Sequence, residues 1–313
     1  MKAKLLLLLI PALMLGACNT VKDKDSSSSS SSSSEEVLDD HDQTTSISDE
    51  RKGEEITMAE AKVIIGNIIS HINAMTADDI SKMSTNLRIF MDDDFSKSQT
   101  NYSKEEPYLH NYSDIKTKVE FEEGKYYPNR ITSDLHFYPD AGQYLTAQSY
   151  FFDGYEMDED GQYHFHNNES YKYYTYMETG VSLRDSIDVY VESVITMMQS
   201  YATQMSGMID SYVDIPESYQ RQLGIKVYSA GEGSLYFLMD AVTMGSKAEF
   251  LIENNMLTYA YSYSNLAIVK AMSGGELEEL EYDIMSAELI IKPGVCDKTY
   301  PDLSSYQYVG ANS

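Results

Sequence analysis

Residues 115–122, IKTKVEFE, mark the point at which the chain changes from helical to strand periodicity. Every second residue from Ile115 to Phe121 is apolar or threonine, and the residues between them are charged. This alternation places the apolar groups on one face of an extended strand. A second alternating run covers 131–137, after a turn near Gly124. Two such runs joined by a short turn predict a pair of antiparallel strands.

Alternating runs recur along most of the remaining chain. The further strand candidates are 144–152, 162–166, 171–177, 225–230, 234–241, 247–253 and 257–263, with a closing pair through Ile268 and through 282–291. The turn signals between them are Asp153-Gly154, Asp160-Gly161, Asn254-Asn255 and Gly274-Gly275. Short connections of this kind predict antiparallel pairing throughout.

Helical spacing precedes these strands. Thr57 with Glu60 forms the pattern of a capping box, and an apolar run at helical spacing follows it. Thr76 with Asp79 predicts a second helix that continues through Leu87.

A longer helix interrupts the strands, beginning near Ser182 and ending before Pro216. Its apolar residues at helical spacing are Leu183, Ile187, Val191, Val194, Met198, Tyr201, Met205, Met208 and Tyr212. Methionine is flexible and adapts to surfaces of varied shape. This face can therefore line either a packed core or a ligand cavity.

The order of elements predicts an α+β fold. We expect a curved antiparallel sheet of roughly ten strands, a half-barrel, wrapped around or covered by the N-terminal helices and the long central helix. Composition divides the chain into a leader at 1–17, a Ser-rich and acidic tether at 18–55, one domain at 56–306 and a tail at 307–313. The tether has few large apolar residues, so it cannot offset the entropy of ordering.

The first 18 residues have the pattern of a secretory leader that ends at a cysteine. Lys2 and Lys4 precede an apolar run that is too short to span a membrane, and the run ends in Leu15-Gly16-Ala17-Cys18. This box resembles that of the bacterial lipoproteins. The resemblance implies that Cys18 carries a diacylglyceryl thioether and becomes the mature N-terminus. The protein would then be anchored by lipid on the extracytoplasmic face of the cell membrane.

The net charge of the chain limits its partners. It is −27, and removing 1–17 deletes two lysines and no acids, which gives −29. Nucleic acids are excluded as partners because phosphate binding needs clustered Lys and Arg. The same charge disfavours electrostatic docking onto an anionic membrane surface. Contact with the membrane is therefore expected only through the lipid on Cys18.

The order of helices and antiparallel strands resembles the LolA/LolB/LppX-like lipoprotein-carrier superfamily. Its members wrap a curved sheet around helices and enclose an apolar cavity for acyl chains. The resemblance implies a carrier of a hydrophobic small molecule or lipid, with the long helix covering the cavity. The ligand-cavity residues expected on this basis are Val194, Met198, Tyr201, Met205 and Met208. The alternatives are an adhesin or envelope-assembly module, and an enzyme acting on the cell wall.

Motifs for catalysis are lacking in the sequence. It contains no Gly-x-Ser-x-Gly, His-Glu-x-x-His or phosphate-binding loop, so we expect a non-catalytic protein without a cofactor. His164 and His166 lie two apart on a strand candidate and are an alternative metal pair, although no third ligand is evident. If Cys18 is lipidated, Cys296 has no partner for a disulfide, and we interpret it as an incidental thiol.

Overall fold

The computed structural model describes residues 47–92, 94–120, 126–138, 143–157, 163–178, 180, 182–273 and 283–310. The helices are α1 (Asp49–Lys52), α2 (Met58–Ala74), α3 (Leu183–Tyr212), α4 (Glu217–Gln222) and α5 (Leu266–Ser273), with short 3₁₀ turns η1 (Ala77–Asp79), η2 (Val242–Met244) and η3 (Leu303–Ser305). The strands are β1 (Glu54–Ile56), β2 (Lys82–Met91), β3 (Asp94–Ser103), β4 (Tyr108–Glu120), β5 (Tyr126–Tyr138), β6 (Gln143–Met157), β7 (Tyr163–Glu178), β8 (Ile225–Ser229), β9 (Leu235–Ala241), β10 (Ser246–Glu253), β11 (Met256–Asn265), β12 (Ile284–Pro293) and β13 (Gln307–Tyr308).

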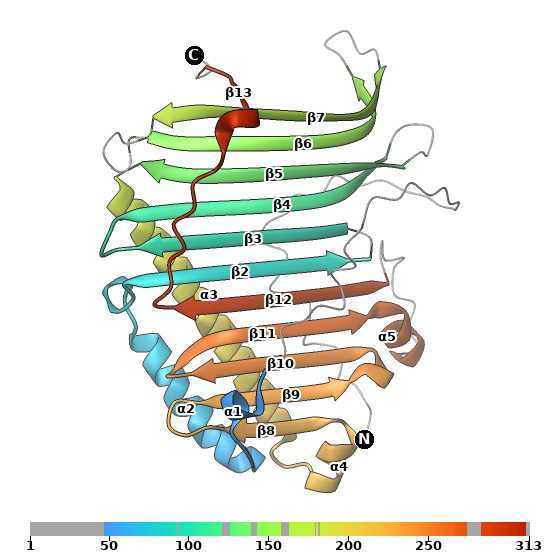
Figure 1. The fold of residues 1–313 in the computed structure, drawn as a ribbon. Coiled ribbons are helices and arrows are strands. Elements are labelled where there is room, and N and C mark those ends of the chain that lie inside the picture. Colours follow the sequence, from blue (N-terminus) through green and yellow to red (C-terminus); the bar gives the residue numbers. More distant parts are fainter. Residues whose placement is uncertain are drawn as a thin grey trace.

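All the strands belong to one large, curved, open sheet (Figure 1). Its order is β1-β8-β9-β10-β11-β12-β2-β3-β4-β5-β6-β7-β13. Every described pair is antiparallel except β13 with β7, which is parallel. The α+β class and the curved antiparallel sheet are confirmed, but the sheet has 13 strands instead of roughly ten. Two of the additional strands are β2 and β3, which were not predicted from the sequence.

The two faces of the sheet have different covers (Figure 1). We call the face that packs against α2 and α3 the inner face. The opposite face, the outer face, is crossed by residues 294–306, here called the C-terminal strap, which runs from the end of β12 to β13. The sheet therefore has its main core on one side only.

The core forms between the two long helices and the inner face. α2 begins at the predicted capping box, in which the Thr57 hydroxyl accepts from the Glu60 amide and the Glu60 carboxylate accepts from the Thr57 amide. α3 begins after Ser182, whose hydroxyl accepts from the Asp185 amide. Both caps satisfy amides that a helix leaves unpaired at its start. The buried sides of the helices then meet each other and the sheet in one cluster.

A smaller apolar cluster lies on the outer face over β9–β12. Tyr236, Leu251, Tyr259 and Tyr261 are buried there beneath Ile47. Ile47 precedes α1, and an ion pair between Arg51 and Glu253 connects α1 to β10. The N-terminal end of the described chain thus covers part of the outer face, as the C-terminal strap does farther along the sheet.

The helix predicted from Thr76 through Leu87 is wrong. Only the 3₁₀ turn η1 forms, and β2 follows it. Met83 and Leu87 are four residues apart, which suits a helix, but Thr85 between them completes a strand period as well. Pairing of β2 with β12 and β3 settles this ambiguity through contacts distant in sequence.

Two further local predictions are wrong. The strand through Ile268 is instead part of α5. Asp153-Gly154, predicted as a hairpin turn, lies inside β6, where the register with β7 shifts as in a β-bulge. By contrast, the turn at Asn254-Asn255 joins β10 to β11 as expected, with both residues at positive φ, 52° and 61°. Asp160-Gly161 and Gly274-Gly275 lie outside the described residues.

The described elements extend beyond the expected domain limits of 56 and 306. At one end β1 pairs with β8, and at the other β13 pairs with β7. Both additions are edge strands of two or three residues, whose stability comes from main-chain pairing instead of an apolar pattern in the sequence. Among the described residues, no helix combines the length and apolarity needed to cross a membrane.

Substitution of Ile68 by alanine should destabilise the fold by about 3 kcal/mol, because it removes buried methyl groups between α2 and the sheet. Ile68 is 0% exposed, whereas Val63 on the same helix is 66% exposed. Val63→Ala should therefore change the free energy of unfolding by no more than about 0.5 kcal/mol. Urea denaturation followed by circular dichroism measures both; equal effects would contradict the placement of the core.

The ion pair between Arg51 of α1 and Glu253 of β10 should make the stability of the fold depend on pH. Arg51 donates hydrogen bonds of 2.9 and 2.7 Å to the Glu253 carboxylate, and the Thr258 hydroxyl donates one of 2.6 Å. These bonds lower the pKa of Glu253 from its usual 4.5, the Arg51 bonds having the larger effect. A lowered carboxyl pKa stabilises the fold above the unfolded pKa, and this contribution is lost as pH falls through the folded pKa.

Glu253→Gln should therefore cost about 1 kcal/mol near neutral pH, and the difference from the unaltered chain should shrink below about pH 4.5. Chemical denaturation from pH 3 to pH 7 measures this difference. Glu232→Gln, at an exposed position between β8 and β9, is the control and should show no such trend. A loss of unfolding free energy in Glu253→Gln that stays constant with pH would argue against a stabilising ion pair between Arg51 and Glu253.

Candidate functional site

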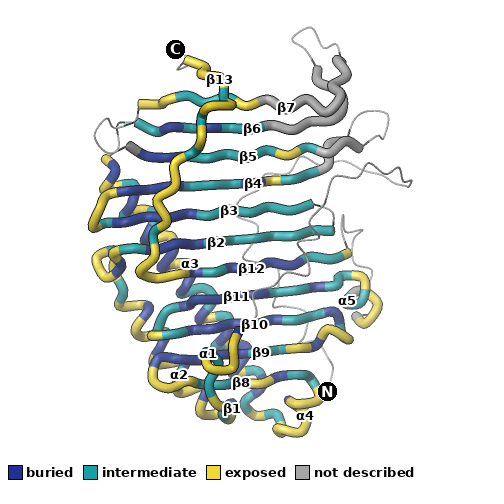
Figure 2. The backbone as a smooth tube through the Cα atoms, viewed as in Figure 1, coloured by how far each residue is buried: buried dark blue, intermediate teal, exposed yellow. Residues whose placement is uncertain are grey.

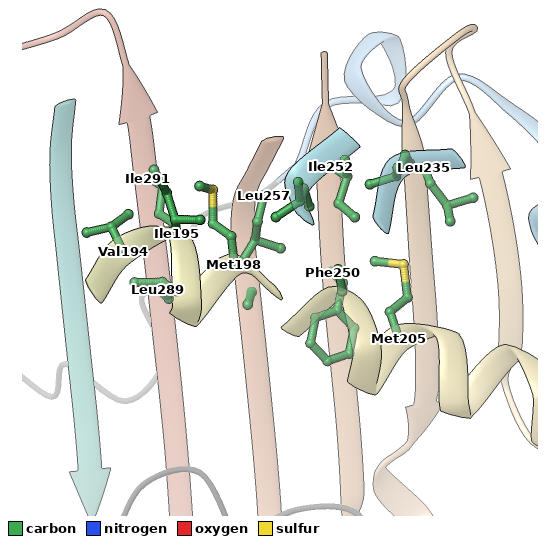
Figure 3. Packing of buried hydrophobic residues seen from close by; sticks show 14 of the residues in the cluster. Val194, Ile195, Met198, Met205, Leu235, Phe250, Ile252, Leu257, Leu289 and Ile291 are labelled. Carbon is green, nitrogen blue, oxygen red and sulfur yellow. The ribbon is translucent and has the colours of Figure 1, made fainter. Parts of the chain in front are cut away.

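The predicted ligand-cavity residues lie on the side of α3 that faces the sheet. Four of them, Val194, Met198, Met205 and Met208, are no more than 2% exposed and belong to the main core cluster. In Figure 3, Met198 lies near Leu257, and Met205 lies between Phe250 and Leu235. Tyr201 is partly buried, with its ring centroid 6.0 Å from that of Phe250. Burial raises the pKa of the Tyr201 phenol. The structure thus brings the five residues together as one apolar wall against the inner face.

The inner face contains a polar row away from the main core cluster. One cross-strand row on β3–β7 consists of Ser98, Ser113, Ser133, Gln148 and Tyr173. The Gln148 amide donates to the Ser133 hydroxyl at 3.3 Å, and the Tyr173 hydroxyl donates to the Gln148 carbonyl. All five residues are partly exposed, and Figure 2 shows the same intermediate burial along much of β3–β5. A polar, partly solvated row of this kind suits a polar ligand better than an acyl chain.

Two histidines and an aspartate form a compact cluster on the outer face of β4 and β5. Asp134 and His136 are two residues apart on β5, so their side chains share a face, and His110 lies directly opposite His136. His110 is 4% exposed and His136 is 0% exposed. A nitrogen from each imidazole and an oxygen of Asp134 all lie within 4.8 Å of one another.

Both rings of the cluster turn the same nitrogen toward the carboxylate. The imidazoles stack with centroids 4.2 Å apart and an interplanar angle of 13°. His110 Nε2 contacts Asp134 Oδ1, and His136 Nε2 lies 3.2 Å from the same oxygen. Burial raises the pKa of Asp134, but its polar contacts with His110 and His136 outweigh this effect and lower the pKa to about 2. The aspartate is therefore an anion between two imidazoles.

The C-terminal strap covers this cluster. The Tyr300 ring stacks on His136 with centroids 5.5 Å apart, and the Tyr108 hydroxyl donates to the Thr299 carbonyl at 3.0 Å. Lys298 forms an ion pair with Glu106 beside these contacts. Aromatic stacking, a main-chain hydrogen bond and an ion pair thus hold the strap over the imidazoles. With both histidines buried and Asp134 partly exposed, the three side chains can share either a proton or a metal ion.

Sequence reasoning missed the His110, Asp134 and His136 cluster. The signal was present, because the predicted strand 131–137 places Asp134 and His136 on one face. The third member, His110, is 24 residues before Asp134, and only the register of β4 with β5 brings it into contact. The predicted alternative pair, His164 and His166, lies in β7. Only the backbone of these two residues is described.

Of the two cysteines, only Cys296 lies among the described residues. Cys18 lies outside the described residues, so its lipidation remains a prediction. Cys296 lies on the strap and is half-buried. Burial raises the pKa of its thiol, and the nearby Lys298 and Lys82 only partly oppose that effect. A raised thiol pKa means less thiolate at neutral pH, in line with the interpretation of Cys296 as an incidental thiol.

Comparison with known proteins identifies no relative. No protein-family model matches the chain, and no curated protein matches it with significant similarity. The function is therefore argued from the chain's own residues.

Replacing Tyr300 by alanine should loosen the C-terminal strap, since it removes the stacking on His136 and an edge contact with Tyr108. Aromatic pairs of this kind contribute about 1 kcal/mol, which corresponds to roughly fivefold faster amide exchange across 299–309. Hydrogen exchange followed by mass spectrometry measures this change. Val295→Ala, at a 38% exposed strap position, is the control. Equal exchange in both variants would show that Tyr300 does not hold the strap.

Proposed function

We propose that this chain is a lipoprotein anchored through Cys18 to the extracytoplasmic face of a bacterial membrane, and that it binds a hydrophobic ligand or lipid without catalysis. The observation that carries the proposal is the methionine-rich side of α3 against the inner face of a single open sheet. Thioether side chains repack around ligands of different shape. An anchored domain next to lipid has such ligands within reach.

The proposed binding mode requires α3 to move relative to the sheet. Met198 and Met205 are 0% exposed, so a ligand would enter by displacing their contacts with the inner face. α3 is one continuous helix with polar residues on its outer side, and its closest helical neighbour is α2. A shift of α3 together with α2 would open the wall while leaving the main-chain pairing of the sheet intact.

A second candidate function is binding of a polar polymer, as expected for an adhesin or envelope-assembly module. The partly exposed row from Ser98 to Tyr173 favours it, because hydroxyl and amide groups beside a tyrosine ring can bind sugars by hydrogen bonding and ring contact. The row lies on the inner face away from the main core cluster, so this candidate uses a different surface from the proposed lipid site. The two candidates therefore predict different effects of substitution.

Native mass spectrometry of a chain that begins at residue 35, produced in a lipid-containing host, should show a nonpolar molecule retained at one per chain. Met205→Glu should abolish retention, because it places a charge in the apolar wall. Met272→Glu, on α5 at a 59% exposed position, should retain the ligand. Circular dichroism verifies that each variant is folded. An unaltered chain that carries no nonpolar molecule would overturn the lipid proposal.

The second candidate is tested on the same preparation with soluble cell-wall polysaccharides. Gln148→Ala should weaken binding about tenfold if the polar row is the site, since it removes one side chain that donates to Ser133 and accepts from Tyr173. Met205→Glu should leave this binding unchanged. If Gln148→Ala binds the polysaccharide with unchanged affinity, the row is excluded as the polysaccharide-binding surface.

A further inference from the structure

The hydrogen-bond network around His136 determines which of its nitrogens carries a proton. The Tyr108 hydroxyl has one proton and donates it to the Thr299 carbonyl, which can only accept. The Tyr108 oxygen also lies 3.3 Å from His136 Nδ1, so it accepts a hydrogen bond from the N–H at that position. Neutral His136 therefore has its lone pair on Nε2. That nitrogen is buried and makes no hydrogen bond, although it faces the Asp134 carboxylate at 3.2 Å.

A lone pair facing a carboxylate oxygen is repulsive unless a proton or a metal ion lies between them. The neighbouring His110 Nε2 contacts the same oxygen of Asp134, so both imidazoles direct a nitrogen at one carboxylate atom. His110 Nδ1 is buried without a hydrogen-bond partner, and so is the side-chain oxygen of Asn101. Asn101 lies directly opposite His110 in the register of β3 with β4. The two atoms do not bond to each other in this structure, and a side-chain rotation that paired them would leave His110 Nε2 available as a ligand.

We propose that His110 Nε2, Asp134 Oδ1 and His136 Nε2 bind a first-row divalent transition metal ion, for which Zn²⁺ is the matching choice, beneath the C-terminal strap. Two imidazoles with a carboxylate form a common set of ligands for these ions. Tetrahedral zinc bonds of about 2.0–2.2 Å separate neighbouring donors by about 3.4 Å. The three donor atoms already lie within 4.8 Å of one another, so side-chain adjustments suffice.

The surroundings resemble those of metal ligands in other proteins. A histidine ligand commonly donates its second ring N–H to a fixed acceptor, which holds its tautomer and orientation. Tyr108 has this role for His136 and is itself fixed by the strap through Thr299. Metal binding at the cluster should therefore also stabilise the strap. This site is on the outer face and shares no residue with the proposed ligand site, so the proposal does not rest on the proposed function.

The test is Zn²⁺ binding to the purified full chain after treatment with a chelator, measured by metal analysis and by competition with a chromogenic chelator. We expect one tightly bound Zn²⁺ per chain. His110→Gln and Asp134→Asn should each weaken its binding at least tenfold, and Tyr108→Phe about tenfold through the lost orientation of His136. Bound Zn²⁺ should also slow amide exchange in the strap at residues 299–309.

Two controls separate this site from other binding. His71→Gln, at an exposed position on α2, and the double variant His164→Gln/His166→Gln should leave the tight site unchanged. The fifty acidic residues of the chain bind cations weakly, and that binding should be equal in all variants. Tight binding that survives both His110→Gln and Asp134→Asn, or that is lost in His164→Gln/His166→Gln, would overturn the proposal.

A measurement on the unaltered chain covers the case in which a buried histidine variant does not fold. Co²⁺ in a four-coordinate site with imidazole ligands absorbs visible light much more strongly than Co²⁺ bound by water and carboxylates. The expected result is an intense visible band that saturates at one Co²⁺ per chain and is removed by Zn²⁺. A weak spectrum that does not saturate at that ratio would mean that the cluster holds only a proton.

Discussion

The packing of α3 across the inner face is the constraint on which the rest of the structure depends. A single open sheet exposes two faces, and an apolar face must be covered by another layer. α3 has 30 residues and so extends about 45 Å. Its contacts with the inner face extend from Tyr144 on β6, which hydrogen-bonds to Ser186, to Phe250 on β10, which packs against Tyr201, and the surface beneath α3 is mainly apolar. Away from α3 along the strands, the same face contains the partly exposed Ser98, Ser113 and Ser133, which need no cover.

The two edges of the sheet must also be protected from pairing with a strand of another molecule. An edge strand leaves a row of unpaired amides and carbonyls, and short edge strands limit that row. Here β1 has three residues and β13 has two. Both come from the ends of the described chain, after segments that cross the outer face. The cover of the outer face and the protection of the edges therefore come from the same two segments of chain, so the described fold does not stop at the limits expected from composition.

Features determined by neighbours in sequence could be predicted, and features determined by pairing could not. The cap at Thr57, the helix start near Ser182 and the turn at Asn254-Asn255 depend on a few consecutive residues, and all three are confirmed. β2 could not be assigned, because its residues suit both periods and strands distant in sequence decide between them. The cluster of His110, Asp134 and His136 has the same limitation. A strand pattern identifies Asp134 and His136 as neighbours, but only the register of β4 with β5 adds His110.

The candidate sites on the two faces are linked through the strands that separate them. Along β4, His110 points outward and Leu109 points into the core, and along β5 His136 and Phe137 do the same. A metal ion that draws the outer donors together also fixes the spacing of β4 and β5. Leu109 and Phe137 belong to the cluster packed against α3, so this spacing bears on how readily α3 separates from the sheet. Metal at the outer face should therefore disfavour the movement of α3 that ligand entry requires, although no residue is shared between the two sites.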